Sequence, residues 1–126
     1  MRTKYGAIRT YSELCQRTFD SRLECVRGEE LRLLEMAGEI AYLEYQIPFR
    51  LCDKPKITYT VDFQYLKNVE WITPNKGERW AAGKKVYEDV KGVLTRETRV
   101  KIAWIKEKFG IDVELIKGGK LYGFIS

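Results

Sequence analysis

Hydrophobic and polar residues alternate in two stretches of the chain, which predicts two β-strands, residues 57–65 and 85–92. In the first stretch the bulky residues occupy the odd positions, so Asp62 falls on the polar face. In the second, Asp89 and Lys91 belong to one set of alternating residues and Glu88 to the other. Because side chains two residues apart share a face of a strand, Asp89 and Lys91 should point the same way. We expect Glu88 to point to the opposite face and to be structural.

Helical periods and turn signals predict the remaining elements. One helix is expected from Asp20 or Ser21 to about Ala37, with Gly38 ending it and an apolar side of Leu23, Val26, Leu31 and Leu34. A second, basic helix is expected from Thr95 to Phe109, with an apolar side of Val100, Ala103, Trp104 and Ile105. Further strands are expected at residues 39–51, where Pro48 indicates an edge or a bulge, and at 111–116 and 120–125, which Gly118 and Gly119 join.

Two regions lack a clear period. Residues 1–19 form a basic arm in this interpretation, and residues 66–84 form a long hairpin connection in which Trp71 and Trp80 flank a turn. These tryptophans could stack on a base, fill a dimer interface or close the hairpin's own small cluster. The predicted order is α-β-β-β-α-β-β. Residues 1–126 then form a single α/β domain, a mixed β-sheet flanked by helices.

The first helix carries a further acid, Glu24, for which the residues allow two interpretations. Ser21 and Glu24 have the spacing of a capping box, in which the glutamate hydrogen-bonds back to the start of the helix. Alternatively, Glu24 lies at the edge of the buried face and points toward the sheet. Gly28, in the middle of the same helix, costs about 1 kcal/mol relative to alanine and indicates a close approach by another element.

Composition narrows the possible chemistry and partners. The chain has no histidine, which excludes catalytic triads and His-ligated zinc, and its net charge of +5 favours a polyanionic partner such as nucleic acid. The three widely spaced cysteines are expected to be free thiols in a reducing compartment. No apolar run is long enough to span a membrane and no signal peptide is indicated, so a cytoplasmic location is expected.

Carboxylates on neighbouring strands, with a lysine beside them, suit metal-assisted phosphodiester hydrolysis. Mg²⁺ prefers hard oxygen ligands, and Mn²⁺ is expected to substitute for it. The candidate ligands are Asp62, Asp89, the Val90 carbonyl and, directly or through water, Glu24. Lys91 would orient the attacking water or act as its base. The competing interpretation is that Asp89 and Lys91 form an ordinary solvent-exposed ion pair.

Four segments, occurring in the same order, resemble the PD-(D/E)xK nuclease superfamily and its small phage-encoded members. They are Lys4-Tyr5-Gly6-Ala7, Phe19-Asp20-Ser21-Arg22-Leu23-Glu24, Tyr59-Thr60-Val61-Asp62-Phe63, and Glu88-Asp89-Val90-Lys91-Gly92 with Thr95. The resemblance implies a restriction-endonuclease-like core with Glu24, Asp62, Asp89 and Lys91 as the active site. It favours the catalytic interpretation of Glu24 over capping.

The resemblance also implies a function in DNA recombination or repair. The small size is similar to Holliday junction resolvases, in which a homodimer presents two sites to a four-way junction, so we expect a magnesium-dependent endonuclease of branched DNA that acts in the cytoplasm of a phage host. The expected DNA contacts are Arg2, Lys4, Tyr5, Ser21, Thr95, Arg96, Arg99 and Lys101. The alternatives are a duplex- or mismatch-specific nuclease with the same fold, and a non-catalytic DNA-binding module.

Overall fold

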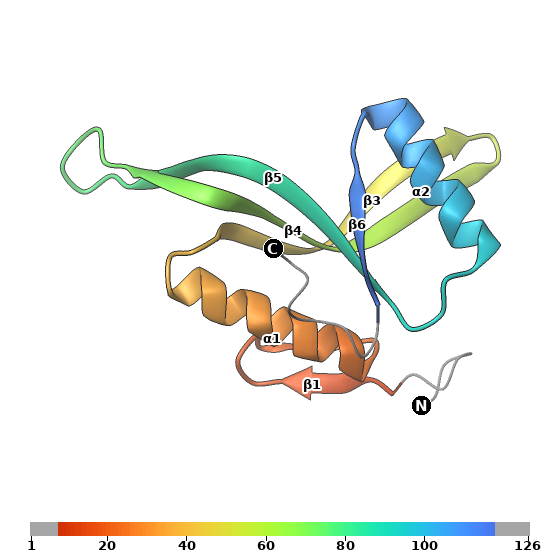
Figure 1. Ribbon diagram of the computed structural model, residues 1–126, viewed down its shortest axis with the longest axis horizontal. Helices are drawn as coiled ribbons and strands as arrows, with labels where there is room; N and C mark the ends of the chain where they lie inside the picture. Colours follow the sequence, from red (N-terminus) through yellow and green to blue (C-terminus); the bar gives the residue numbers. More distant parts are fainter. Residues whose placement is uncertain (1–7, 118–126) are drawn as a thin grey trace.

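The computed structural model describes residues 8–117, which form a mixed α/β fold (Figure 1). Its elements are β1 (Thr10–Ser12), β2 (Arg17–Phe19), α1 (Arg22–Met36), β3 (Ala41–Asp53), β4 (Lys56–Ile72), β5 (Trp80–Lys91), α2 (Arg96–Phe109) and β6 (Val113–Lys117). The predicted strand 120–125 lies outside the described residues.

The central sheet has the strand order β3-β4-β5-β6. Strands β3, β4 and β5 are antiparallel neighbours, and β6 runs parallel to β5 after the α2 crossover, so the sheet is mixed, as predicted. Strand β3 forms one edge of the sheet, which confirms the inference from Pro48.

Helix α1 begins where Ser21 caps it, with the Ser21 Oγ accepting a hydrogen bond from the Glu24 N–H at 3.1 Å. It ends at Ala37, and Gly38 follows with a φ of +80°. The predicted apolar side is partly wrong, because Val26 and Leu34 are exposed.

The buried side of α1 is formed by Cys25, Arg27, Gly28 and Leu31. The inference from Gly28 is confirmed: a Cβ at this position would lie 2.6 Å from the Phe19 Cζ and 3.3 Å from the Phe63 Cε1. The rings of Phe19 and Phe63 therefore pack against α1 at Gly28, where the helix has no side chain, and this contact determines which side of α1 is buried.

Helix α2 is capped by Thr95, whose Oγ1 accepts from the Thr98 N–H at 3.1 Å, and it ends at Gly110 with a φ of +70°. The buried side is narrower than predicted. Ile105 is fully buried, whereas Val100 is 54% exposed and Ala103 is also exposed. Thr98, one of the two buried residues of α2, lies within hydrogen-bonding reach of the Tyr59 side chain.

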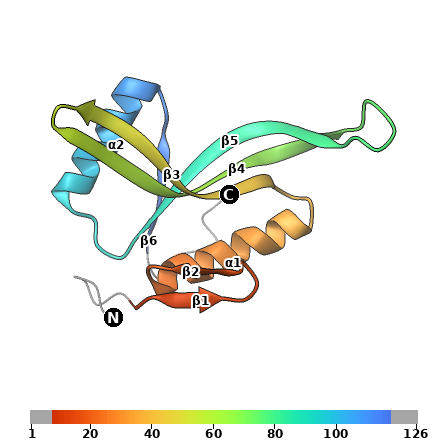
Figure 2. The same cartoon turned by 180° about the vertical axis from the view of Figure 1, so that it is seen from behind.

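Two apolar clusters hold the helices on the twisted sheet. The first lies between α1 and the sheet and includes Leu31, Phe63 and Val86, and the second joins α2 to the sheet through Ile105, Phe49 and Val61. Figures 1 and 2 show the helices on different stretches of the sheet, with β1 and β2 against α1. The end of β5 belongs to the first cluster through Val90, and Leu23, at the start of α1, packs against the same cluster.

Two regions differ from the sequence prediction. Residues 10–19 form the antiparallel pair β1–β2 rather than an aperiodic arm. Residues 66–84 are mostly strand, because β4 continues to Ile72 and β5 begins at Trp80. We call residues 67–86 the β4–β5 arm, since β3 pairs with β4 only as far as Leu66 and β6 pairs with β5 only from Tyr87. The arm extends beyond the helices in Figure 1.

Candidate functional site

The candidate site lies where β4 and β5 separate. Their register runs from Ile72↔Trp80 to Phe63↔Glu88, and beyond that pair the Val90 N–H donates to the Asp62 carboxylate, Oδ2, at 2.8 Å. Where the two strands separate, the Asp62 carboxylate thus accepts the hydrogen bond that a backbone carbonyl of β4 would accept in a regular sheet. The Asp62 carboxylate is thereby fixed beside the next residues of β5.

Asp89 is buried at this position, held by two groups on one oxygen. The Tyr59 hydroxyl donates to Asp89 Oδ2, and the Lys91 Nζ lies 3.4 Å from the same oxygen. Lys91 also lies over the Tyr59 ring, 5.5 Å from its centre. Asp89 and Lys91 do point the same way, as predicted. Because Asp89 is buried, the competing interpretation of a solvent-exposed ion pair is wrong.

Glu24 approaches the same place from the first turn of α1. Burial and the charge of Asp20 raise the pKa of Glu24, with a further contribution from Asp89. Its carboxylate lies 3.4 Å from the Ser21 Oγ and within hydrogen-bonding reach of Asp62. The capping interpretation is therefore correct for Ser21, and the carboxyl of Glu24 still belongs to the acidic group at the site.

The neighbouring acids raise the pKa of two of the three carboxyls, those of Glu24 and Asp62. Burial, then the charges of Asp89 and Glu24, raise the pKa of Asp62 to about 9, and the carboxyls of Asp62 and Asp89 are within hydrogen-bonding reach. In the described residues, the buried Asp89 Oδ1 accepts no hydrogen bond from an N–H or hydroxyl group. A proton on Asp62 or a bound cation would reduce the repulsion between Asp62 and its acidic neighbours.

The donor set suits a hard divalent ion but is not a preformed cage. Across residues 8–117, no three Asp, Glu or Cys side chains are arranged closely enough to hold a metal ion. Asp62, Asp89 and the Val90 carbonyl could supply two or three oxygen ligands, and Mg²⁺ usually keeps several waters in its shell. The unpaired Asp89 Oδ1 and the raised pKa of Asp62 both fit a cation at this position.

A cleft of about 1030 Å³ opens beside these carboxyls. Glu24, Tyr59, Val90 and Lys91 line it, and Asp62 and Asp89 lie behind this lining. Four of the predicted DNA contacts also line the cleft: Ser21, Thr95, Arg96 and Lys101. Arg99 is exposed on α2 outside the lining, and Arg2, Lys4 and Tyr5 are outside the described residues.

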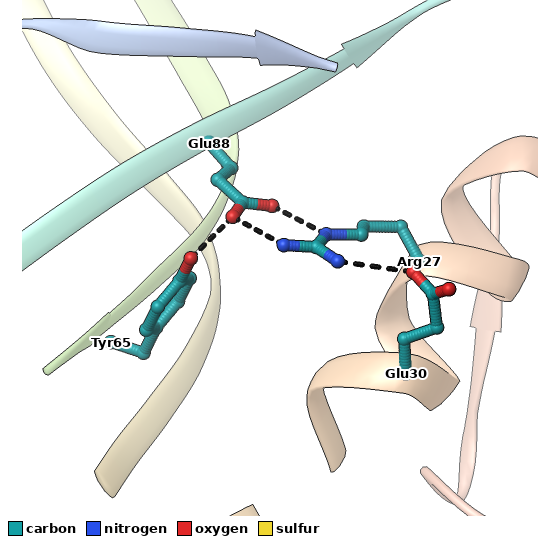
Figure 3. A network of polar contacts seen from close by, with 4 residues as sticks. All are labelled: Arg27, Glu30, Tyr65 and Glu88. Carbon is teal, nitrogen blue, oxygen red and sulfur yellow. Dashed lines mark hydrogen bonds and ion pairs between the residues drawn. The ribbon is translucent and has the colours of Figure 1, made fainter. Parts of the chain in front are cut away.

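The opposite face of β5 carries a buried polar network (Figure 3). Glu88 accepts from the Arg27 Nε at 2.8 Å and Nη2 at 2.7 Å, and also from the Tyr65 hydroxyl. Arg27 reaches the partly exposed Glu30 at 3.0 Å. Glu88 is therefore on the face opposite Asp89 and paired within the fold, in agreement with the structural role predicted for it.

Sequence reasoning missed Tyr59 and Arg27. Tyr59 lies on the bulky, odd-numbered face of β4, so alternation separates it from Asp62, and only the separation of the strands brings its hydroxyl to Asp89. Arg27 is a charged residue in a predicted helix, a type that is usually exposed, and it is nevertheless buried. The single available signal for it was the unexplained glycine beside it, Gly28.

Comparison with known proteins gives one match. A family model described as "Protein of unknown function (DUF1064)" matches residues 2–122. No curated protein and no solved structure matches the chain. Of the helices in the part of the chain that the structure describes, none is long and apolar enough to cross a membrane.

Proposed function

Since the chain belongs to the DUF1064 family, whose description assigns no activity, we propose a function from the site itself. The protein is a metal-dependent endodeoxyribonuclease that hydrolyses phosphodiester bonds in branched DNA. Its preferred substrate is the four-way Holliday junction. The observation that carries the proposal is the buried Asp89, which has an oxygen without a hydrogen-bond partner among the described residues and lies close to Asp62 and Glu24. Glu24 in turn lines a cleft with basic residues.

The fold is in keeping with this proposal at a coarse level. A mixed four-stranded sheet with a helix on either side of the β3–β4–β5 segment in the sequence is the arrangement expected of a restriction-endonuclease-like core. The junction preference and a homodimer with two sites rest on the resemblance of the four sequence segments. They are parts of the proposal that a substrate comparison has to test.

Each residue of the site has a separate task in this reaction. Asp62 and Asp89 would hold Mg²⁺ or Mn²⁺, with the Val90 carbonyl as a third ligand and Glu24 completing the set. The bound ion would activate water and offset charge on the phosphoryl oxygens. Lys91, held 3.4 Å from Asp89 and partly exposed to the cleft, would orient the attacking water and stabilise its deprotonated form.

The cleft supplies the binding groups for the DNA backbone. Arg96 on α2 and Arg22 on α1 bring positive charge to its lining, and Lys101 lies there paired with Glu97 at 2.8 Å. The capped N-terminus of α2 opens onto the same space, where N–H groups and the helix dipole favour phosphate. The scissile phosphate would thus lie between Lys91 and the start of α2.

The test is cleavage of a labelled four-way junction and a linear duplex in Mg²⁺ and in Mn²⁺. We expect paired symmetric nicks from the wild type and a loss of about 100-fold or more in Asp62→Asn and Lys91→Ala. The matched controls are Asp53→Asn, whose side chain is 83% exposed, and Lys56→Ala, which is exposed at the β3–β4 turn. Both should cleave at the wild-type rate.

Three outcomes would count against the proposal. Equal cleavage by the wild type and Asp62→Asn would remove the assigned site. Equally fast cleavage of linear duplex would remove the junction preference and favour a duplex nuclease. Tight junction binding without cleavage in either metal would favour a non-catalytic DNA-binding module.

A further inference from the structure

The Tyr59 hydroxyl belongs to a chain of hydroxyl groups that ends at Asp89. Tyr59 donates to Asp89 Oδ2, and Thr98 lies within hydrogen-bonding reach of the Tyr59 side chain. The Thr95 Oγ1 in turn donates to the Thr98 Oγ1 at 3.0 Å. Three hydroxyls therefore connect the start of α2 with a carboxyl of the candidate site.

The hydrogen bonds of this chain run in one direction. A hydroxyl has one proton to donate, and that of Tyr59 is used on the Asp89 carboxyl. Thr98 can therefore only donate to Tyr59, which leaves the Thr98 oxygen to accept from Thr95, as the structure shows. Hydrogen bonds that run in one direction polarise and strengthen one another. The whole chain is thus directed at Asp89.

This contact makes the two oxygens of Asp89 unequal. Oδ2 accepts from the Tyr59 hydroxyl and lies 3.4 Å from the Lys91 Nζ. Oδ1 is buried and has no hydrogen-bond partner among residues 8–117. Of the two oxygens, Oδ1 is therefore the one that remains to bind a cation, and the Tyr59 hydroxyl helps to keep the carboxyl in the orientation that presents it.

The ring of Tyr59 is held by contacts that do not need its hydroxyl. It packs against the second apolar cluster, and the Lys91 Nζ lies over it, 5.5 Å from its centre. At the other end of the chain, Thr95 is fixed as the cap of α2. Phenylalanine in place of Tyr59 would therefore keep the ring and its contacts and remove the hydrogen bond to Asp89.

We propose that Tyr59 is a positioning residue of the metal site, whose hydroxyl, supported by Thr98, holds the Asp89 carboxyl ready to bind a divalent cation beside Asp62. The inference rests on the proposed function only in taking such a cation as the ligand of these two acids. Hydrogen-bond partners of metal-binding carboxylates commonly account for a 10–100-fold effect on metal affinity, because they orient the ligand before the metal arrives.

Tyr65 provides a matched control for the loss of a buried hydroxyl. It lies on β4, as Tyr59 does, and its hydroxyl donates to the buried Glu88 on the opposite face of β5. Tyr65→Phe therefore removes the same kind of hydrogen bond without touching the site. It should lower stability and leave metal binding unchanged.

The experiment titrates Mn²⁺ into the wild type, Tyr59→Phe, Thr98→Val and Tyr65→Phe, and follows the free ion by electron paramagnetic resonance. Binding that is lost in Asp62→Asn identifies the site. We expect the Kd for Mn²⁺ to rise about tenfold or more in Tyr59→Phe and by a smaller factor in Thr98→Val. In Tyr65→Phe it should equal the wild-type value. Partial unfolding would lower the number of sites filled and not the Kd of those that remain, so the readout separates positioning from stability.

The dependence of DNA cleavage on Mn²⁺ gives a second readout. In Tyr59→Phe, the Mn²⁺ concentration for half-maximal rate should rise about tenfold, and saturating Mn²⁺ should restore most of the wild-type rate. A rate that stays low at saturating Mn²⁺, with an unchanged half-maximal concentration, would count against a role in metal binding.

Three results of the titration would overturn the proposal. An unchanged or lower Kd in Tyr59→Phe would show that the hydroxyl does not prepare Asp89 for the ion. An equal rise in Tyr65→Phe would mark a general effect of losing a buried hydroxyl. A wild type without Mn²⁺ binding that depends on Asp62 would remove the metal site and the positioning role together. If the predicted binding pattern appears but the wild type cleaves no DNA, the positioning role holds and the nuclease proposal fails.

Discussion

Replacing Glu88 with glutamine should strongly destabilise the fold without touching the cleft. Burial alone would lower the pKa of the Arg27 guanidinium, but the hydrogen bonds and charge of Glu88 outweigh burial, and the pKa is raised. Because the intrinsic basicity of a guanidinium keeps arginine protonated in proteins, Arg27 keeps its charge in the variant and is left buried with a neutral partner. Breaking a buried ion pair in this way costs about 3–5 kcal/mol.

The neighbours of Arg27 place the expected value at the low end of that range. Glutamine keeps one acceptor oxygen, and Glu30 still lies 3.0 Å from the Arg27 Nη1. We expect a loss of about 3 kcal/mol, which corresponds to a fall in Tm of about 10 °C for a chain of this size. Urea unfolding followed by circular dichroism measures the free energy directly.

Glu30→Gln is the matched control, because it removes the other carboxylate that contacts the same arginine. The Glu30 side chain is 31% exposed, so this change should cost less than about 1 kcal/mol. Arg27→Met supplies a second comparison. It leaves the Glu88 carboxylate buried without its cation, so it should also cost about 3–5 kcal/mol. Equal, small losses in Glu88→Gln and Glu30→Gln would refute this account of the network.

Three further predictions concern other parts of the molecule. Gly28→Ala should lower stability by about 1–3 kcal/mol in urea unfolding, despite alanine's better helix propensity, because the new Cβ meets Phe19; a stabilised variant would contradict the close approach. Asp62→Asn should raise stability in EDTA by about 1–3 kcal/mol at pH 8. Because the pKa of Asp62 is raised to about 9, the folded wild type binds the extra proton and loses stability as pH rises from about 4 to 9, so the gain should vanish near pH 4. Ser21→Ala should cost about 1 kcal/mol through loss of the α1 cap, and thermal unfolding with no change in Tm would count against that role.

Alternation along β5 was sufficient to separate Glu88 from Asp89 and Lys91, because a strand enforces a period of two whatever surrounds it. The end of α1 was equally predictable, since Gly38 takes the positive φ that ends the helix. The same reasoning failed across the β4–β5 arm. There the bulge after Lys67 shifts the phase of the alternation, so a long strand has the pattern of a loop.

The candidate site was predicted in its acids and its lysine but not in the groups that hold them. Tyr59 is brought to Asp89 by the separation of β4 from β5, which depends on tertiary packing and has no local sequence signal. The apolar side of α1 was partly wrong for a related reason. Phe19 and Phe63 fill the space beside Gly28, so the buried side of the helix centres on that glycine and not on the largest apolar residues.

The alternation of Glu88 and Asp89 on β5 also has a consequence for how faithfully the chain folds. A slip of β5 by one residue can put Asp89 in the place of Glu88, so Arg27 would still find a carboxylate and the ion pair alone would not reject the error. The apolar neighbours do reject it. Val86 and Val90 belong to the first apolar cluster, and the same slip would place Tyr87 and Lys91 beneath α1 in their stead. The register that buries Val86 and Val90 is therefore also the register that places Asp89 beside Tyr59 and Lys91.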